Sequence, residues 1–196
     1  MVQTITVMYE AEIKFVIQDP ATISQFFDAK SPAQTESYLD TYLTQGKLVP
    51  GGSEREFRIR TIRRADGVRN VLTFKDKVVD AGTLSKREFE IEIGEADEAT
   101  RLFQAMGFEP DIQLHKECVN WKFQHNTLQI LASLVTVPEL KGHFLELEAI
   151  VSDESQVSAT IKDLRHLAES AGLSRQDETT TSYTGSVRLA RSSTNS

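Results

Sequence analysis

The chain has 196 residues, of which 39% are hydrophobic and 26% charged, proportions that exclude a disordered or fibrous protein. Its formal net charge of −7 opposes binding to nucleic acid or to an anionic membrane surface. The single cysteine, Cys118, excludes an intrachain disulfide and a zinc site built from several thiolates. We expect one domain over residues 1–188 and a disordered tail over 189–196.

The N-terminal residues, MVQTITVMYEAEIKF, lack the charged, apolar and small-residue regions of a secretory signal. No apolar run approaches the roughly 18 residues that a membrane-spanning helix needs. These features predict a cytoplasmic protein.

Residues 5–15 alternate between two kinds of side chain, which predicts a β-strand. One parity is mainly apolar, and the other carries Glu10, Glu12 and Lys14. The strand therefore has one ionic face.

Further elements are expected along the first half of the chain. They are a helix over 20–30, a short strand over 36–43, a turn or mobile loop over 47–54, strands over 55–62, 68–78 and 85–94, and a helix over 97–108. The Ala-Asp-Gly at 65–67 is typical of a hairpin turn. We expect Asp97 to cap the last helix, Gly107 to end it, and Arg63 and Arg64 to lie in a solvated loop.

The second half predicts three strands, a long amphipathic helix and one short strand. They cover 112–123, 126–137 and 143–151, then 153–173, and last a short stretch around Tyr183. The long helix is expected to begin at a cap on Asp153 or Ser155 and to end at Gly172. Trp121 and Phe123 are expected to pack outward beneath a helix.

Long hairpin-linked strands with a few helices place the chain in the α+β class, with an antiparallel sheet that curls or closes. Acids and bases cluster on the polar faces strand by strand, as in Glu10 with Glu12 and Arg58 with Arg60. Such neighbours lie about 7 Å apart and repel by roughly 2 kcal/mol at an effective dielectric constant of about 20.

Two interpretations of these ionic faces are open. In the first, the charges face water and the apolar residues form a central core, as is common in antiparallel sheets. In the second, the ionic faces line the inside of a closed barrel, where paired carboxylates require a cation and paired guanidinium groups require an anion. A tunnel that holds a polyphosphate and a divalent metal satisfies both requirements.

The order of motifs along the chain resembles that of the CYTH superfamily, the triphosphate tunnel enzymes. The motifs are Glu10-x-Glu12-x-Lys14, Asp40-Thr-Tyr42, Arg58-x-Arg60, LTFK ending at Lys75, Lys86-x-Glu88-x-Glu90, Gly107-Phe108, Lys116, the segment from Gly142 to Glu148, and Ser182-Tyr183. The resemblance implies a closed antiparallel eight-stranded β-barrel, a triphosphate tunnel, with amphipathic helices packed outside.

The same resemblance implies the roles of individual residues. Mg²⁺ or Mn²⁺ would be held by Glu10, Glu12, Glu146 and Glu148. The triphosphate would be bound by Lys14, Arg58, Arg60, Lys75, Lys86 and Lys116, with Glu88, Glu90 and Tyr183 as further substrate contacts. Among these, Lys14, Arg58 and Lys75 would act at the reacting phosphates.

The sequence also departs from the family pattern. Where a Lys-x-Arg pair is common, Lys116 is followed by Cys118, and residues 127–137 contain no acid where family members commonly place an Asp. We interpret Cys118 as a tolerated small residue rather than a reactive thiol.

The function implied is that of a divalent-metal-dependent enzyme acting on a triphosphate, with class IV adenylate cyclase chemistry placed first. The first alternative is a triphosphatase acting on tripolyphosphate, thiamine triphosphate or a nucleoside triphosphate. The second is a module that binds an organic phosphate without turnover, or an enzyme acting on an unusual diphosphate. The expected partner is a small-molecule triphosphate, not nucleic acid or a membrane, and a homodimer is left open.

Overall fold

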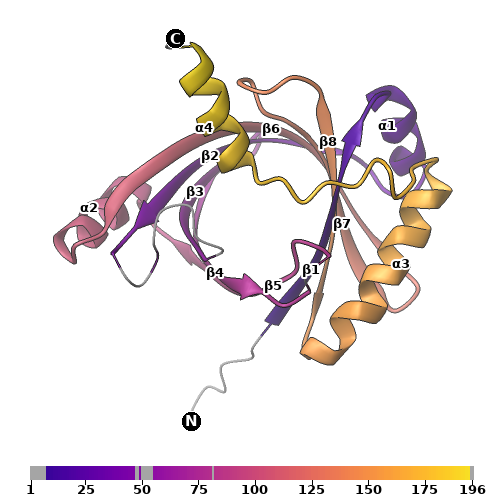
Figure 1. The fold of residues 1–196 in the computed structure, drawn as a ribbon, viewed down its shortest axis with the longest axis horizontal. Coiled ribbons are helices and arrows are strands. Elements are labelled where there is room, and N and C mark those ends of the chain that lie inside the picture. Colours follow the sequence, from indigo (N-terminus) through magenta and orange to yellow (C-terminus); the bar gives the residue numbers. More distant parts are fainter. Residues whose placement is uncertain (1–7, 47–48, 50–54, 81, 195–196) are drawn as a thin grey trace.

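A computed structural model describes residues 8–46, 49, 55–80 and 82–194, and over these residues the chain forms a closed barrel of eight antiparallel strands (Figure 1). The strand order around the barrel is β1-β5-β4-β3-β2-β6-β7-β8. The strands are β1 (Met8–Ile17), β2 (Gln34–Thr44), β3 (Glu56–Arg64), β4 (Gly67–Val78), β5 (Lys86–Ile93), β6 (Glu109–His125), β7 (Leu128–Thr136) and β8 (His143–Val151). The expected fold class is confirmed.

Four α-helices accompany the barrel in the described part of the chain: α1 (Pro20–Asp28), α2 (Ala96–Ala105), α3 (Val157–Ser170) and α4 (Tyr183–Thr194). A 3₁₀ turn over Glu154–Gln156 precedes α3, and Asp153 caps it by accepting a hydrogen bond from the backbone N–H of Ser155. None of these helices has both the length and the apolarity that crossing a bilayer requires.

The two faces of β1 point in opposite directions. Ala11, Ile13 and Phe15 belong to an apolar cluster that also contains residues of α1 and α3 outside the barrel. Glu10 and Glu12, on the other parity, line the barrel interior. The second of the two interpretations, with ionic faces turned inward, is therefore correct.

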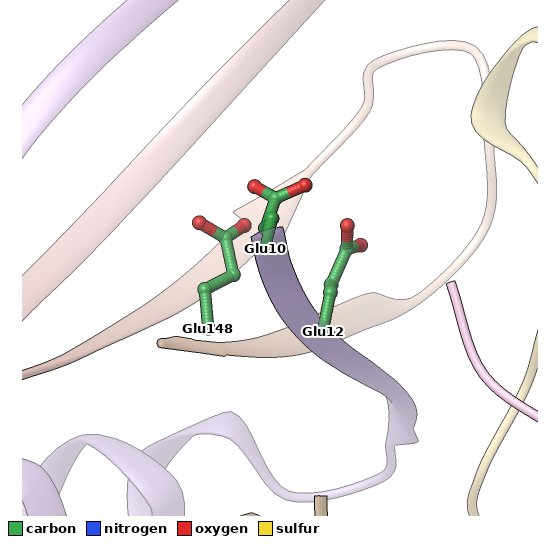
Figure 2. A group of neighbouring side chains, drawn as sticks. All are labelled: Glu10, Glu12 and Glu148. Carbon is green, nitrogen blue, oxygen red and sulfur yellow. The ribbon is translucent and has the colours of Figure 1, made fainter. Parts of the chain in front are cut away.

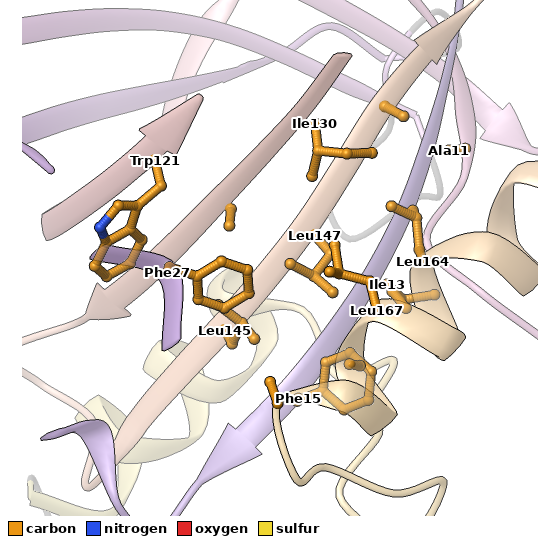
Figure 3. Packing of buried hydrophobic residues seen from close by; sticks show 14 of the residues in the cluster. Ala11, Ile13, Phe15, Phe27, Trp121, Ile130, Leu145, Leu147, Leu164 and Leu167 are labelled. Atoms are coloured by element: carbon orange, nitrogen blue, oxygen red, sulfur yellow. The ribbon is translucent and has the colours of Figure 1, made fainter. Parts of the chain in front are cut away.

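The largest apolar core lies between the outer wall of the barrel and the helices α1 and α3 (Figure 3). Trp121 on β6 packs against Phe27 of α1, and its indole N–H donates a hydrogen bond to Asp28. Leu164 and Leu167 of α3 are buried in the same core. The expectation that Trp121 packs outward beneath a helix is confirmed.

A second apolar cluster lies beneath α2, on the side of the barrel away from α3 (Figure 1). There the ring of Phe57 on β3 contacts those of Phe103 and Phe108. The expected cap at Asp97 is wrong, because the helix begins one residue earlier, at Ala96, and Asp97 lies in its first turn. A carboxylate in that place still interacts favourably with the helix dipole.

The wall between β1 and β5 is completed by segments outside the regular strands. Direct pairing covers only the end of β1 near Met8, from Met8↔Glu88 to Glu10↔Lys86. Further along, the backbone of Leu84 donates to the Glu12 carbonyl, and that of Thr179 donates to the Lys14 carbonyl. The chain after α3 therefore holds the ionic strand in place where β5 is absent.

The C-terminal segment differs from the expectation. Tyr183 begins the helix α4 rather than lying in a short strand, and residues 189–194, expected as a disordered tail, continue that helix. Tyr183 and Val187 are four residues apart, so a helix places both on one face, and both are buried in a cluster with Leu114 of β6. Their burial accounts for the helix.

Two local expectations concern the first strands. The short strand expected over 36–43 is longer, because β2 spans Gln34–Thr44 and pairs along its length with β6. The hairpin expected at 65–67 is present, with Arg64 paired to Gly67. Residues 5 and 7 of the first strand, most of the loop expected over 47–54 and the end of the expected tail, 195–196, lie outside the described residues.

The buried outer core yields a stability prediction. Leu164→Ala should lower the free energy of unfolding by about 2–5 kcal/mol, because its fully buried side chain leaves a cavity between α3 and the barrel. Leu189 is 70% exposed, so Leu189→Ala should change the free energy of unfolding by less than about 0.5 kcal/mol. Denaturant unfolding of both variants measures the difference, and equal losses would contradict the placement of the core.

Candidate active site

The barrel encloses a cavity of about 560 Å³. Every residue that the sequence nominates for the site contributes to its lining: Glu10, Glu12, Lys14, Arg58, Arg60, Lys75, Lys86, Glu88, Glu90, Lys116, Glu146, Glu148 and Tyr183. These side chains come from six of the strands and from the start of α4. The tunnel thus brings together residues that are up to 173 positions apart, from Glu10 to Tyr183.

Three carboxylates converge on one side of this cavity. Glu10 and Glu12 extend from β1, and Glu148 extends from β8, where it lies opposite Glu12 (Figure 2). Each offers an oxygen within 4.8 Å of the others. We call Glu10, Glu12 and Glu148 the acidic group.

The acidic group has the donor chemistry that a hard divalent cation requires. Burial, together with the neighbouring carboxylates, raises the pKa of Glu12 from 4.5 to about 8 and that of Glu148 well above its ordinary value. Charged carboxylates at this spacing repel one another, and a cation between them removes the repulsion. Mg²⁺ and Mn²⁺ prefer carboxylate oxygens, so these residues fit such an ion.

Lys75 lies at the edge of the acidic group. Its ammonium forms an ion pair with Glu10 and lies 3.7 Å from Glu12 and 3.9 Å from Glu88. Burial opposes the charge of Lys75, but these three carboxylates raise its pKa well above the ordinary value. Lys75 therefore stays charged and partly neutralises the acids.

Glu146, which the resemblance places among the metal ligands, is not part of the acidic group found in the described residues. It lies opposite Lys14 on β1. Although burial disfavours its charge, Lys116 and Lys14 hold the pKa of Glu146 below its ordinary value. The structure thus associates Glu146 with cations, and its role as a metal ligand stays a prediction.

The opposite wall is basic and is organised by Asp40. Arg60 donates two hydrogen bonds to this carboxylate, from Nε at 2.6 Å and from Nη2 at 2.7 Å. Arg58 and Lys116 each have a nitrogen 3.7 Å from the same oxygen of Asp40. Although burial opposes ionisation, the two arginines hold the pKa of Asp40 well below its ordinary value. We call Arg58, Arg60 and Lys116 the basic wall.

Asp40 is not among the site residues expected from the sequence, although the alternation of side chains along its strand indicates that it faces inward. Glu36, Tyr38, Asp40 and Tyr42 alternate along β2, which places them on the inward face. Asp40 is fully buried behind the basic wall, and it uses two donors of Arg60. Arg60 is therefore oriented by Asp40, which leaves Arg58 and Lys116 with fewer protein partners.

Tyr183 lies between two lysines at the α4 end of the tunnel. The ammonium groups of Lys14 and Lys116 each lie 4.3 Å from the centre of its ring, in cation–π contact. Lys14 also donates a hydrogen bond to the carbonyl of Thr181. Burial lowers the pKa of Lys14 and raises that of Tyr183.

The remaining nominated residues occupy β5. Lys86 forms an ion pair with Glu56, at 2.5 Å. Burial raises the pKa of Glu88 to about 7, and Glu90 accepts a hydrogen bond from the hydroxyl of Thr73. These residues complete the tunnel lining between the acidic group and β4.

Arg63 and Arg64 both lie within β3 rather than in the expected loop, and only Arg63 is solvent-exposed as expected. Arg64 is still within β3, so the alternation that turns Arg58 and Arg60 inward also turns Arg64 into the tunnel, where it pairs with Glu36. Cys118 is buried, and burial raises the pKa of its thiol to about 12, which agrees with an unreactive side chain.

The acidic group predicts how stability depends on pH. The pKa of Glu12 is about 8 in the folded state and 4.5 ordinarily, so the folded state keeps a proton that the unfolded state has lost. Without metal, the melting temperature should therefore fall as the pH rises from about 4.5 to about 8. Added Mn²⁺ should raise it more at pH 8 than at pH 5, because the ionised carboxylates bind the cation.

Thermal unfolding with EDTA or Mn²⁺ measures this effect, and Glu12→Gln should flatten the metal-free profile. Glu117→Gln, a change of a half-exposed carboxylate outside the tunnel, should leave the profile unchanged. An equal response to Mn²⁺ at both pH values would contradict a cation site at the acidic group.

Comparison with known proteins places this geometry in a family. No curated protein matches the chain. Among solved structures, the PH1819 protein of Pyrococcus horikoshii has a TM-score of 0.78 at 20% identity, covering 92% of this chain and 98% of that one. A Vibrio parahaemolyticus protein, named provisionally as an adenylate cyclase, has a TM-score of 0.71 at 18% identity, covering 94% and 98%.

A third structure is HpAC1 from Hippeastrum, described as a provisional adenylyl cyclase with a dominant triphosphatase activity. Its TM-score is 0.60 at 15% identity, covering 93% of this chain and 95% of that one. At these identities the structures establish a shared fold. The sequence model of the CYTH domain matches residues 8–183, which is most of the chain. The protein therefore belongs to the CYTH domain family.

Proposed function

We propose that the protein is a divalent-metal-dependent enzyme that breaks a phosphoanhydride bond in a nucleoside triphosphate, and that it converts ATP to cyclic AMP and pyrophosphate. The observation that carries the proposal is that the acidic group and the basic wall face each other across one cavity inside the closed barrel. A triphosphate with its cation complements both surfaces, because each would otherwise keep uncompensated buried charge.

The residues of the basic wall bind and orient the phosphates in this proposal. Arg58 presents a planar fork suited to two phosphate oxygens, and Lys116 and Lys14 act as compact point charges. Lys14, Arg58 and Lys75 are the groups assigned to the reacting phosphates. Charge neutralisation at phosphate oxygens is what a divalent cation supplies when bound by Glu10, Glu12 and Glu148.

The size of the cavity supports an organic triphosphate. A volume of about 560 Å³ lies within the range of about 300–1,000 Å³ that is typical of sites for small organic ligands. Apolar side chains, among them Ile62 and Leu131, line part of the wall beside the charged groups. Inorganic tripolyphosphate would make no use of them.

Hydrolysis is the second candidate reaction. In a cyclase, the ribose 3′-hydroxyl attacks the α-phosphorus and pyrophosphate leaves. In a triphosphatase, water attacks the terminal phosphorus. The same basic wall serves either reaction by stabilising charge on the phosphate oxygens. The triphosphatase activity described for HpAC1, which shares this fold, supports keeping hydrolysis as the alternative.

Product identification separates the candidates. The protein is incubated with Mg²⁺ or Mn²⁺ and either ATP, GTP, thiamine triphosphate or tripolyphosphate. Cyclic AMP with pyrophosphate supports cyclisation, and release of inorganic phosphate supports hydrolysis. Metal-linked binding without any product over hours would support a phosphate-binding module instead.

Glu12→Gln should abolish metal-dependent turnover without unfolding the protein. The substitution keeps the shape of the side chain but removes a charge from the acidic group. Turnover measured across a metal titration, beside Glu117→Gln as a control, tests this. Full activity of Glu12→Gln at low metal concentration would show that the acidic group does not hold the catalytic cation.

Arg58→Ala should weaken tripolyphosphate binding by about 10- to 100-fold, the effect of losing charge-assisted hydrogen bonds of about 1.5–3 kcal/mol. It should also remove most of the rise in melting temperature that tripolyphosphate gives the parent protein. Arg63→Ala is the matched control, because Arg63 lies on the same strand but is exposed. An unchanged melting shift in Arg58→Ala would exclude Arg58 as a phosphate ligand.

A further inference from the structure

A second polar cluster lies in the tunnel beside the basic wall, and it shares no residue with that wall or with the acidic group. It consists of Glu36 and Tyr38 on β2, Arg64 at the end of β3, and Asn120 on β6, and all four line the cavity. Because β2 runs antiparallel to both neighbours, its first residues lie beside the end of β3 and the later part of β6. We call these residues the amide cluster.

The contacts within the amide cluster fix the orientation of Asn120. Its Nδ2 donates to a carboxylate oxygen of Glu36 at 2.9 Å and to the hydroxyl oxygen of Tyr38 at 2.7 Å. The Tyr38 hydroxyl donates to the same oxygen of Glu36. The amide nitrogen of Asn120 therefore faces these two acceptors, and an inverted amide would place its oxygen against a carboxylate.

The carbonyl oxygen of Asn120 is left as an unsatisfied acceptor. Only 2% of the residue is exposed, and Oδ1 has no hydrogen-bond partner among the residues that the structure describes. A buried acceptor without a donor costs free energy, so this position favours a ligand that brings an N–H group. Glu36, equally buried, is already engaged by Tyr38, Asn120 and Arg64.

The surroundings indicate which kind of donor fits. Asn120 is four residues from Lys116 along β6, which places their Cα atoms about 13 Å apart. Arg60 of the basic wall lies nearer, because its guanidinium is 4.3 Å from the centre of the Tyr38 ring, in cation–π contact. The amide cluster is therefore within reach of an organic group attached to a triphosphate bound at that wall. Ile62 and Leu131 contribute apolar surface to the same cavity, and the planar guanidinium of Arg64 suits stacking on a flat ring.

We propose that the carbonyl oxygen of Asn120, oriented by Glu36 and Tyr38, accepts a hydrogen bond from the exocyclic amino group of the substrate's heterocycle. The inference rests on the proposed function and narrows it. The substrate is then a triphosphate with an amino-bearing base, such as adenine. Asn120 determines specificity for the base, while the basic wall binds the phosphates.

Calorimetry with ATP, ITP and tripolyphosphate, each with Mg²⁺, tests the inference. ITP carries a carbonyl oxygen where ATP carries the amino group. The parent should bind ATP at least about tenfold more tightly than ITP, a difference of about 1.4 kcal/mol. In Asn120→Ala, ATP affinity should fall to that of ITP while tripolyphosphate affinity stays unchanged.

Gln113→Ala is the matched control, because it removes an exposed amide from the outward face of the same strand. Equal affinity of the parent for ATP and ITP would overturn the inference even if Asn120→Ala does not fold, and would leave the proposed function intact. A preference for ATP that persists in Asn120→Ala would also overturn it. Failure of all three ligands to bind would overturn the proposed function together with the inference.

Discussion

The constraint on which this structure depends is the burial of ionic side chains inside a closed barrel. A charge removed from water is tolerated only when a partner compensates for it. Asp40 meets this requirement incompletely for the basic wall, since its single carboxylate is bound by Arg60 through two nitrogens and also faces Arg58 and Lys116. The acidic group meets it only in part, because Lys75 supplies one positive charge to three carboxylates and Glu88. The tunnel is therefore built to take up further charge.

In this arrangement, the residues that form the main apolar core are different from those that line the candidate site. Because the ionic faces point inward, the apolar faces of the strands point outward and require helices to cover them. The main core consequently lies between the barrel wall and the helices α1 and α3, where Trp121, Phe27 and Leu164 are buried. The interior has a smaller part in the packing, in the cluster of Leu114 and Val187 beside the tunnel, and its ionic side chains are available for binding.

Much of the fold and of the candidate site could be predicted from the sequence, since a strand's period of two assigns each side chain to one face. The inward placement of Glu10, Glu12 and Arg58 is of this kind. Prediction fails where the length of a strand matters. A strand that ends at residue 62 leaves Arg64 in a loop, whereas β3 continues through Arg64 to the hairpin turn. It also failed at Tyr183, where a segment that alternates weakly forms a helix because Tyr183 and Val187 are buried together.

By itself, the sequence determined that the strands have ionic and apolar faces, and that their motifs follow the order of a tunnel family, because both are properties of a one-dimensional pattern. Only the tertiary structure decided which charges meet. Glu148 rather than Glu146 lies with Glu10 and Glu12, Asp40 lies behind Arg60, and Asn120 is aligned by Glu36. These contacts depend on strand register and on closure of the barrel, which join residues far apart in the chain and leave no local signal.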